Sequence, residues 1–273
     1  MEIKINGKTA DIKIDNEKTV AQVMAGIEQW LSGSGHRLSG LAIDGKAADL
    51  SSLENIFSKE IDTINTLDIS TMSITELGVI SLVNLLGDID EFDALSFDGR
   101  NEFFTNWKER PQTLFILEQM PDLFSFFENT FLNGAFSSQT LRSITEERMR
   151  EIKTPVDEFS NLRPLIEETC ERLTDLPLDI QTGKDARAAQ TIQIFSGITE
   201  KIFRVYRQLE IQGYITQSAA KETLSQQIND FNSAVKELLQ AYEKNDTVLI
   251  GDIAEYEIAP RLAKIYNTAA GEK

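Results

Sequence analysis

The sequence predicts an α+β protein, in which a small N-terminal unit of strands and one helix is followed by a mainly α-helical bundle. The first observation is the alternation of polar and apolar residues over positions 2–5 and 10–14, on either side of Asn6-Gly7, as in a β-hairpin. The second is a stripe of apolar residues at three- and four-residue steps over 188–209 and again over 224–242, which is typical of amphipathic helices. These two stripes predict a pair of antiparallel helices.

The composition is that of an ordinary globular chain with a strong acidic excess. The 273 residues are enough for two domains. The net charge of -17 disfavours nucleic acids and anionic membrane surfaces as partners, because both would repel the chain. The first residues show no signal-peptide pattern, and no apolar run is long enough for insertion into a membrane. The single cysteine, Cys170, cannot form an intramolecular disulfide, and we expect a cytoplasmic protein.

The first 71 residues are expected to fold as one small unit. The residue types that start and stop helices and turns place its further elements after the hairpin. These elements are a helix capped by Thr19, a strand over 37–43 that ends at Asp44-Gly45, a short helix that starts at 51–54, and a strand over 61–69.

This order of elements resembles that of the ubiquitin-like β-grasp family, and residues 41–46 are similar to the third-strand hairpin of that fold. Conjugated members of the family end in a free Gly-Gly tail, whereas residues 70–73 continue here into further protein. The resemblance therefore implies a binding module or a structural cap, and supports neither conjugation nor sulfur carriage. Its core is expected to hold apolar side chains from all parts of the unit: Ile3, Ile5, Ile12, Val23, Ile27, Leu41 and Leu67.

Residues 72–153 form the second expected region, which is helical. Residues 73–76, with the sequence Ser-Ile-Thr-Glu, are a capping box that starts a helix expected to end at Gly87. The acidic stretch 88–93 does not fit a calcium loop, since Phe92 occupies a ligand position. We expect this stretch to be a solvated linker.

Ten phenylalanines lie between positions 91 and 136. Three of them, Phe124, Phe127 and Phe131, share one helical face. Two alternatives stay open for this face: it is part of the core between helical layers, or it is a partly exposed groove for a partner helix. In the second case these three side chains are the candidate partner-binding residues.

Residues 154–273 are expected to form an antiparallel helical bundle. The stretch 176–182 contains Pro177 and is expected to be a connection between helices, because proline interrupts a helix. Pro260 lies inside the apolar pattern of the last helix, so that a kink is expected near Tyr256.

Residues 183–185 and 242–260 resemble segments of uncharacterised helical proteins of bacteria. The domain that this resemblance suggests covers about residues 155–266. It implies the bundle architecture and a bacterial source, and it implies no activity.

Few residues of this sequence are suited to catalysis. His36 is the only histidine and lies in a glycine-flanked turn, whereas Ser-His-Asp, Cys-His and zinc sites all depend on histidine. Asp252 and Glu255 are three residues apart on one helical face and could perform acid–base chemistry or bind magnesium. The alternative is a solvated face with Arg261 as the counter-ion.

Two functions follow from these observations. The favoured one is a non-catalytic protein-interaction module, such as an adaptor, scaffold or chaperone-like protein, with protein partners and no cofactor. It is favoured because the sequence carries no pattern for a nucleophile, base, metal or cofactor site. The alternative is a magnesium-dependent hydrolase that uses Asp252 and Glu255, which requires both carboxylates to face one concave pocket.

Overall fold

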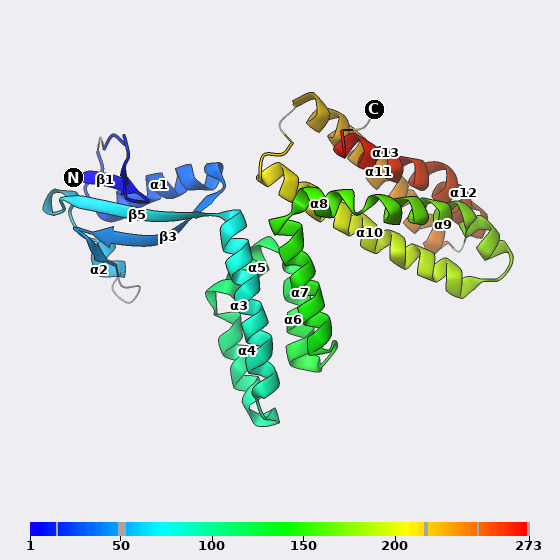
Figure 1. The fold of residues 1–273 in the computed structure, drawn as a ribbon, viewed down its shortest axis with the longest axis horizontal. Helices are drawn as coiled ribbons and strands as arrows, with labels where there is room; N and C mark the ends of the chain where they lie inside the picture. The colour runs from blue at the N-terminus through cyan, green and yellow to red at the C-terminus, as the bar shows by residue number, and fades with distance from the viewer. Residues whose placement is uncertain (15, 49–52, 216–217, 245, 272–273) are drawn as a thin grey trace. The chain divides into compact units, whose positions relative to one another are not determined.

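The structure is a computed structural model, and it describes residues 1–14, 16–48, 53–215, 218–244 and 246–271. A five-stranded sheet with one long helix comes first and helices follow (Figure 1), which confirms the expected α+β class. The chain divides into two compact units, residues 1–145 and 146–273. None of the helices in the described ranges is both long and apolar enough to cross a membrane.

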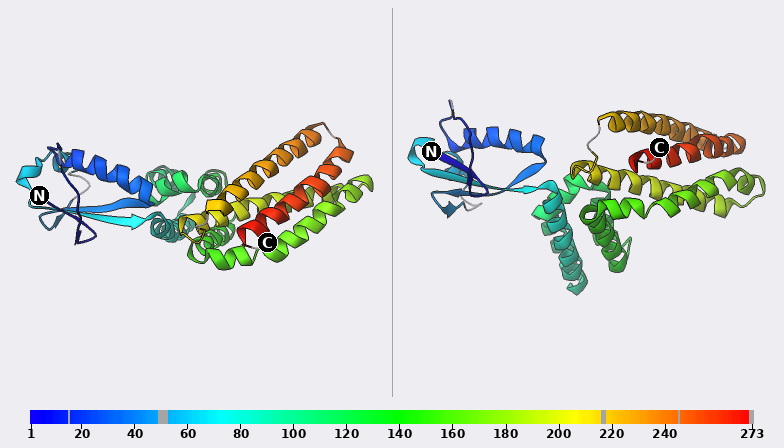
Figure 2. Two further views of the ribbon diagram at one scale, coloured as in Figure 1. Left: turned by 90° about the horizontal axis from the view of Figure 1, so that it is seen from above. Right: turned by 45° about the horizontal axis from the view of Figure 1, so that its top comes forward.

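The N-terminal sheet has the strand order β2-β1-β5-β3-β4. Its central pair, β1 and β5, is parallel, and the other pairs are antiparallel. Helix α1 lies on one face of the sheet (Figures 1 and 2), as in a β-grasp fold. The elements are β1 (Glu2–Ile5), β2 (Lys8–Thr9), α1 (Val20–Ser34), β3 (His36–Ile43), β4 (Lys46–Ala47), α2 (Leu53–Phe57), η2 (Ile61–Thr63) and β5 (Thr66–Ser73). The expected helix start at 51–52 lies outside the described residues.

The core between α1 and the sheet contains most of the residues predicted for it. Five of them are buried: Ile3, Val23, Ile27, Leu41 and Leu67. The prediction is wrong for Ile12, which is 38% exposed, and Ile5 is only half-buried. The reason is that β2 ends at Thr9, so the expected strand over 10–14 does not form. The N–H of Ile12 donates instead to the carbonyl of Ala10 at 3.0 Å.

Helix α3 (Ile74–Ala94) starts at the predicted capping box and continues well past its predicted end. The N–H of Glu76 donates to Ser73 Oγ at 3.1 Å, and Glu76 Oε2 accepts from the Ser73 N–H at 2.9 Å. The expected stop at Gly87 and the expected linker over 88–93 are therefore wrong, because this stretch is the last part of the helix.

Burial of Asp88 explains why the acidic stretch is helical. Its side chain is 4% exposed and accepts from Trp107 Nε1 at 3.1 Å, Arg110 Nη1 at 2.5 Å and Gln112 Nε2 at 3.2 Å. Arg110 also pairs with Glu91 one turn further along α3. A buried carboxylate with this many donors is stable inside a protein, so the acidic residues fix α3 to the following helices.

The aromatic residues of the first unit form its second core. Trp107 is fully buried and its ring centroid lies 5.4, 6.1 and 5.0 Å from those of Phe124, Phe127 and Phe131. The helices that carry and surround them are η3 (Phe97–Gly99), α4 (Arg100–Lys108), α5 (Pro111–Gln119), α6 (Pro121–Asn133) and α7 (Ser138–Lys153). Of the two alternatives for the phenylalanine face, the structure shows the first: the face is part of the core between helices.

The second unit is a helical bundle. Helix α9 packs against α10, α12 and α13, and α11 packs against α13. Aromatic side chains bridge α10 and α11, with ring centroids of Phe195 and Phe231 6.0 Å apart and those of Phe203 and Phe231 6.4 Å apart. The elements are α8 (Pro155–Ser160), α9 (Arg163–Gln181), α10 (Asp185–Ile211), α11 (Ser218–Glu243), α12 (Thr247–Asp252), the π-helix η4 (Ile253–Ile258) and α13 (Ala259–Ala269).

The expected kink near Tyr256 takes the form of the π-helix. The N–H of Ala259 donates to the carbonyl of Ala254, five residues earlier. This wide turn accommodates Pro260, which has no N–H to donate. Side chains bond to carbonyls near the proline: Cys170 Sγ donates to Ala259 O at 3.4 Å and Arg261 Nη1 to Glu257 O at 3.0 Å.

Helices α9 and α12 meet at Pro177 and Gly251, which are both inside helices. The expected connection over 176–182 is therefore wrong. Gly251 is buried, and a Cβ atom at this position would lie 2.8 Å from Cβ and 2.9 Å from Cγ of Pro177. The proline ring thus occupies the space that only a glycine leaves free.

Substitution of Gly251 by Ala is expected to destabilise the protein by about 1–3 kcal/mol, because the added methyl group overpacks the contact with Pro177. Gly197→Ala is the matched control, since a Cβ there has no neighbour within 4 Å. In α10 it should stabilise the protein by about 0.5–1 kcal/mol. Denaturant unfolding of both variants measures the two effects. Equal effects of the two substitutions would contradict the close packing of α9 and α12.

Truncation of Phe231 to Ala should lower the free energy of unfolding by about 3–5 kcal/mol, because this side chain is 1% exposed and bridges α10 and α11. Thermal melts of the variant provide the measurement. A shift in Tm of a degree or less would contradict the packing of the bundle.

Candidate functional site

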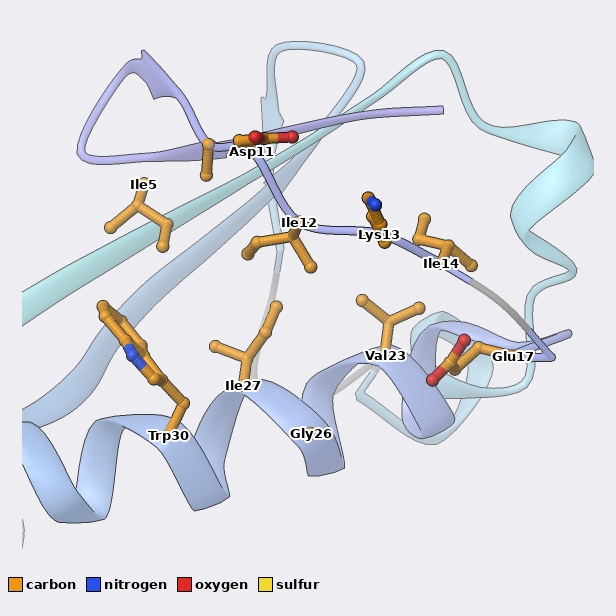
Figure 3. A pocket seen from close by; sticks show the side chains of 11 residues that line it. Ile5, Asp11, Ile12, Lys13, Ile14, Glu17, Val23, Gly26, Ile27 and Trp30 are labelled. Carbon is orange, nitrogen blue, oxygen red and sulfur yellow. The ribbon is translucent and has the colours of Figure 1, made fainter.

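An apolar pocket of about 580 Å³ lies beside α1 in the N-terminal unit (Figure 3). The segment 10–14 runs above it, α1 forms its floor, and Ile5 of β1 closes one end. The pocket exists because β2 ends at Thr9 and the chain leaves the sheet before it reaches α1. Its lining consists of Ile5, Ala10, Asp11, Ile12, Lys13, Ile14, Glu17, Val23, Gly26, Ile27 and Trp30.

The side chains around the pocket separate into an apolar interior and a charged rim. Figure 3 shows Ile12 directed toward Val23 and Ile27 of α1, while the carboxylate of Asp11 lies at the level of the segment above the pocket. Trp30 stands at one end of the pocket and is 58% exposed. At Gly26 a Cβ atom would meet nothing within 4 Å, so this glycine leaves part of the floor open.

The chemistry of the pocket suits binding. Among the described lining residues there is no histidine, cysteine, serine or tyrosine, and the titratable groups are two carboxylates and one lysine. Apolar walls with one exposed indole are suited to an apolar side chain of a ligand, and the indole N–H adds one hydrogen-bond donor.

The residues predicted from sequence as possible sites lie elsewhere. The three phenylalanines of the candidate partner-binding groove, Phe124, Phe127 and Phe131, are at most 9% exposed. They belong to the aromatic core and do not form a partly exposed groove. Asp252 is exposed and Glu255 half-buried. Neither carboxylate lines the pocket beside α1 or the groove between α11 and α13. The described part of the chain also has no group of three or more metal-ligating side chains.

Next to these carboxylates lies a polar groove of about 350 Å³ between α11 and α13. Its charged side chains include Glu257 and Arg261, which form an ion pair with each other. Glu255 accepts a hydrogen bond from Tyr256, which raises the pKa of that phenol. The ion pair occupies Glu257 and Arg261, and the hydrogen bond occupies Glu255, as on a solvated helical face.

A buried charged cluster in the second unit is the other place where chemistry is conceivable. Glu151 of α7 accepts from Arg204 Nε at 3.1 Å and Nη2 at 3.0 Å, and Arg148 Nη1 lies 3.3 Å away. Lys201 pairs with Glu147 at 2.8 Å beside it. Burial raises the pKa of Glu151 to about 7, and Arg148 opposes this rise. The Glu151 side chain is 3% exposed, and its carboxylate accepts from arginines of both α7 and α10, so we assign the cluster a structural role.

The sequence signal for the pocket is weak. Trp30 lies on the same apolar stripe of α1 as Val23 and Ile27, and this position is typical of a core residue. Gly26 on the same helix and the alternation over 10–14 give the only further signals. They identify the pocket only when it is known that β2 ends at Thr9.

Comparisons with known proteins give separate matches for the N-terminal and the C-terminal part of the chain. Residues 1–73 match the family model of the TP0873 N-terminal domain. Residues 157–268 match a domain of unknown function, DUF8042. An uncharacterised protein of Treponema pallidum (strain Nichols) is 22% identical over 261 residues, which cover 95% of this chain and 92% of that protein. No solved structure matches the chain.

The raised pKa of Glu151 predicts a pH dependence of stability. Its pKa in the folded state is about 7, above the ordinary value of 4.5, so the folded protein binds more protons than the unfolded chain between these values. The free energy of unfolding should therefore fall as pH rises through this window. Glu151→Gln, which keeps a neutral side chain, should remove this part of the pH dependence. Urea unfolding across the window measures it, and a wild-type stability that rises relative to the variant would show that the arginines keep Glu151 ionised.

Proposed function

We propose that this chain is a non-catalytic protein-interaction module, an adaptor, scaffold or chaperone-like protein of bacteria. Its β-grasp unit would hold a partner protein at the pocket beside α1. The observation that carries this proposal is the exposed Trp30 at the end of an apolar pocket of about 580 Å³. The lack of histidine, cysteine, serine and tyrosine among the described lining residues supports binding over chemistry.

Trp30 has the properties of an interface anchor. Tryptophan is among the residues that contribute most to protein–protein affinity, and truncation of such an anchor to alanine typically costs at least about 2 kcal/mol of binding free energy. Here the indole is 58% exposed and adjoins the apolar side chains of Ile12 and Ile27. A partner that covers Trp30 and inserts an apolar side chain into the pocket would bury all three surfaces together.

The charge of the chain restricts the kind of partner. With 44 acidic and 27 basic residues, the protein attracts basic surfaces and repels acidic ones at long range. The partner is therefore expected to combine an apolar anchor with a basic surrounding surface. Lys13 and the carboxylates of Asp11 and Glu17 at the pocket rim would set the orientation of such a partner.

The pocket can be filled without damage to the fold. Gly26 and Gly33 both lie in α1, and a Cβ atom at either position has no neighbour within 4 Å. Leucine is a better helix former than glycine by up to about 1 kcal/mol, so Gly26→Leu and Gly33→Leu should both fold. Only Gly26 lines the pocket, which makes Gly33→Leu a matched control.

We expect affinity capture from a lysate of the source bacterium to recover a partner with wild type and with Gly33→Leu. Gly26→Leu and Trp30→Ala should lose it, because the first fills the pocket and the second removes its anchor. Quantitative mass spectrometry of the captured proteins measures the difference. Capture of the same proteins by all four chains would contradict the assignment of the pocket, and capture of none would contradict the interaction function.

A further inference from the structure

A second apolar pocket, of about 420 Å³, lies in the helical bundle of the second unit. Helix α9 contributes Leu176 and Ile180 to its lining, α10 contributes Ala188 and Ile192, and α12 contributes Ile250. All of these helices belong to one compact unit. The function proposed for the N-terminal pocket makes no use of this second one.

Small residues near the start of α10 leave this space open. Further along α10, the rings of Phe195 and Phe203 reach Phe231 of α11. Near the start of α10 the lining residues include Ala188 and Ala189, whose methyl groups cannot span the same gap. Because α9 packs on both α10 and α12, and α11 packs on α12, the pocket is a groove with α10 and α11 as its walls. We call it the α10–α11 groove.

Large apolar side chains are exposed beside the α10–α11 groove. Tyr242 of α11 lines the groove and is 65% exposed. Leu239 lies one turn earlier on the same face of α11, and Val248 and Leu249 follow the lining residue Thr247 in α12; all three apolar side chains are exposed. Exposed apolar surface of this density often marks a contact with a macromolecule, and it extends beyond what a small ligand inside the groove would cover.

The charges around the α10–α11 groove favour a basic partner. Asp185, at the start of α10, is the charged member of the described lining residues. Glu243 and Asp246 flank the lining residues of α11 and α12 in sequence and are exposed, as is Lys244 between them. Carboxylates are thus in excess here, and a lysine or arginine of the partner would pair with Asp185.

The same charges disfavour a second copy of this chain as the occupant. A second copy would bring the same carboxylates and a net charge of -17, which opposes association at long range. The cations of α10 nearest to Asp185 in sequence, Lys184 and Arg187, pair with Asp179 of α9. They are therefore engaged within the unit, and the partner is expected to be a different protein with basic residues of its own.

The partner segment is expected to be α-helical. In its described residues the second unit consists of helices and their connections, so it offers no strand edge with which an extended peptide could pair. A helix satisfies its backbone groups internally and can bury an apolar face in a groove. From Asp185 to Ile192 the wall formed by α10 extends over about two helical turns, which fits apolar side chains at i and i+4 of a partner helix.

We infer that the α10–α11 groove docks a basic amphipathic helix of another protein. Apolar side chains of this helix enter the groove beside Ala189 and cover Tyr242, while a neighbouring lysine or arginine pairs with Asp185. The inference goes beyond the function proposed for the N-terminal pocket, because the two sites share no residue. With both sites occupied, one chain would link two partners.

Fluorescence anisotropy of labelled model peptides with the full chain tests the inference, in about 0.15 M salt to screen general charge attraction. The probe is a leucine–lysine peptide of about 18 residues, long enough to form a helix, with its leucines on one helical face. One control peptide has the same composition in an order without a common apolar face, and the other has glutamate in place of lysine. We expect the probe to bind about tenfold more tightly than either control.

Two substitutions in the α10–α11 groove have matched controls on the same unit. Ala189→Phe, which fills the groove, and Tyr242→Ala, which removes its exposed aromatic wall, should each raise the Kd of the probe about tenfold. Ala186→Phe, at an exposed position of α10 outside the lining, and Tyr256→Ala should leave it unchanged. Tyr256 is 64% exposed and also lies outside the groove lining. Thermal melts confirm that each variant is folded.

A charge reversal and a variant of the other site complete the test. Asp185→Lys should raise the Kd about fivefold, and Glu222→Lys, which makes the same change in net charge at an exposed position of α11 outside the groove lining, should change it by less than about twofold. Gly26→Leu, in the N-terminal pocket, should have no effect.

Three results would overturn the inference. Equal binding of the probe and its scrambled control would show charge attraction without a groove. Loss of binding in Gly26→Leu but not in Ala189→Phe would place the helix in the N-terminal pocket. Absence of measurable binding of the probe to wild type would leave the groove without its expected occupant. Each of these results leaves the capture experiment on the N-terminal pocket to be decided by its own variants, so failure of the two proposals can be distinguished.

Discussion

The parallel pairing of β1 with β5 is the interaction on which the N-terminal unit depends. It joins Ile3 to Leu67 and Ile5 to Ile69 across more than sixty residues of chain, and it buries Ile3, Leu67 and Ile69 beneath α1. Because β5 is central, β3 can pair with its other side. The same strand leads directly into α3 through the capping box at Ser73. The sheet and the first helix of the following region are thus fixed by one pair of strands.

The same pairing determines where the candidate site lies. β1 uses one edge for β5, and only residues 8–10 pair with its other edge. Beyond Ala10 the chain has no neighbouring strand and crosses toward α1, which leaves an apolar space under Ile12 and an exposed Trp30. The pocket and the exposed segment over 11–13 are therefore two results of one short strand.

Features that depend on neighbouring residues could be predicted from the sequence. Asn6-Gly7 and Asp44-Gly45 all have positive φ, between 48° and 78°, as their residue types indicate. The capping box at Ser73 and the stripe that buries Phe231 depend likewise on local spacing. The burial of Asp88 could not be predicted, because the residues that donate hydrogen bonds to it, Trp107, Arg110 and Gln112, lie 19–24 residues away. The contact between Gly251 and Pro177 could not be predicted either, because these residues are still further apart in sequence. The pocket depends on where β2 ends, and the alternation of polar and apolar residues does not show this.

The π-helix at Ile253–Ile258 also affects how this bundle tolerates change in chain length. A π-turn contains one residue more than the α-helical turn that it replaces, and each helical residue rotates the chain by about 100° because a turn has 3.6 residues. A relative that lacks one residue here could form an unbroken α-helix, in which Leu262, Ile265 and Tyr266, which are buried in this chain, would keep their face relative to α12, because the wide turn absorbs the extra residue. A length difference of one residue in this region can thus leave the buried face of the C-terminal helix unchanged, and homologues should be aligned by that face.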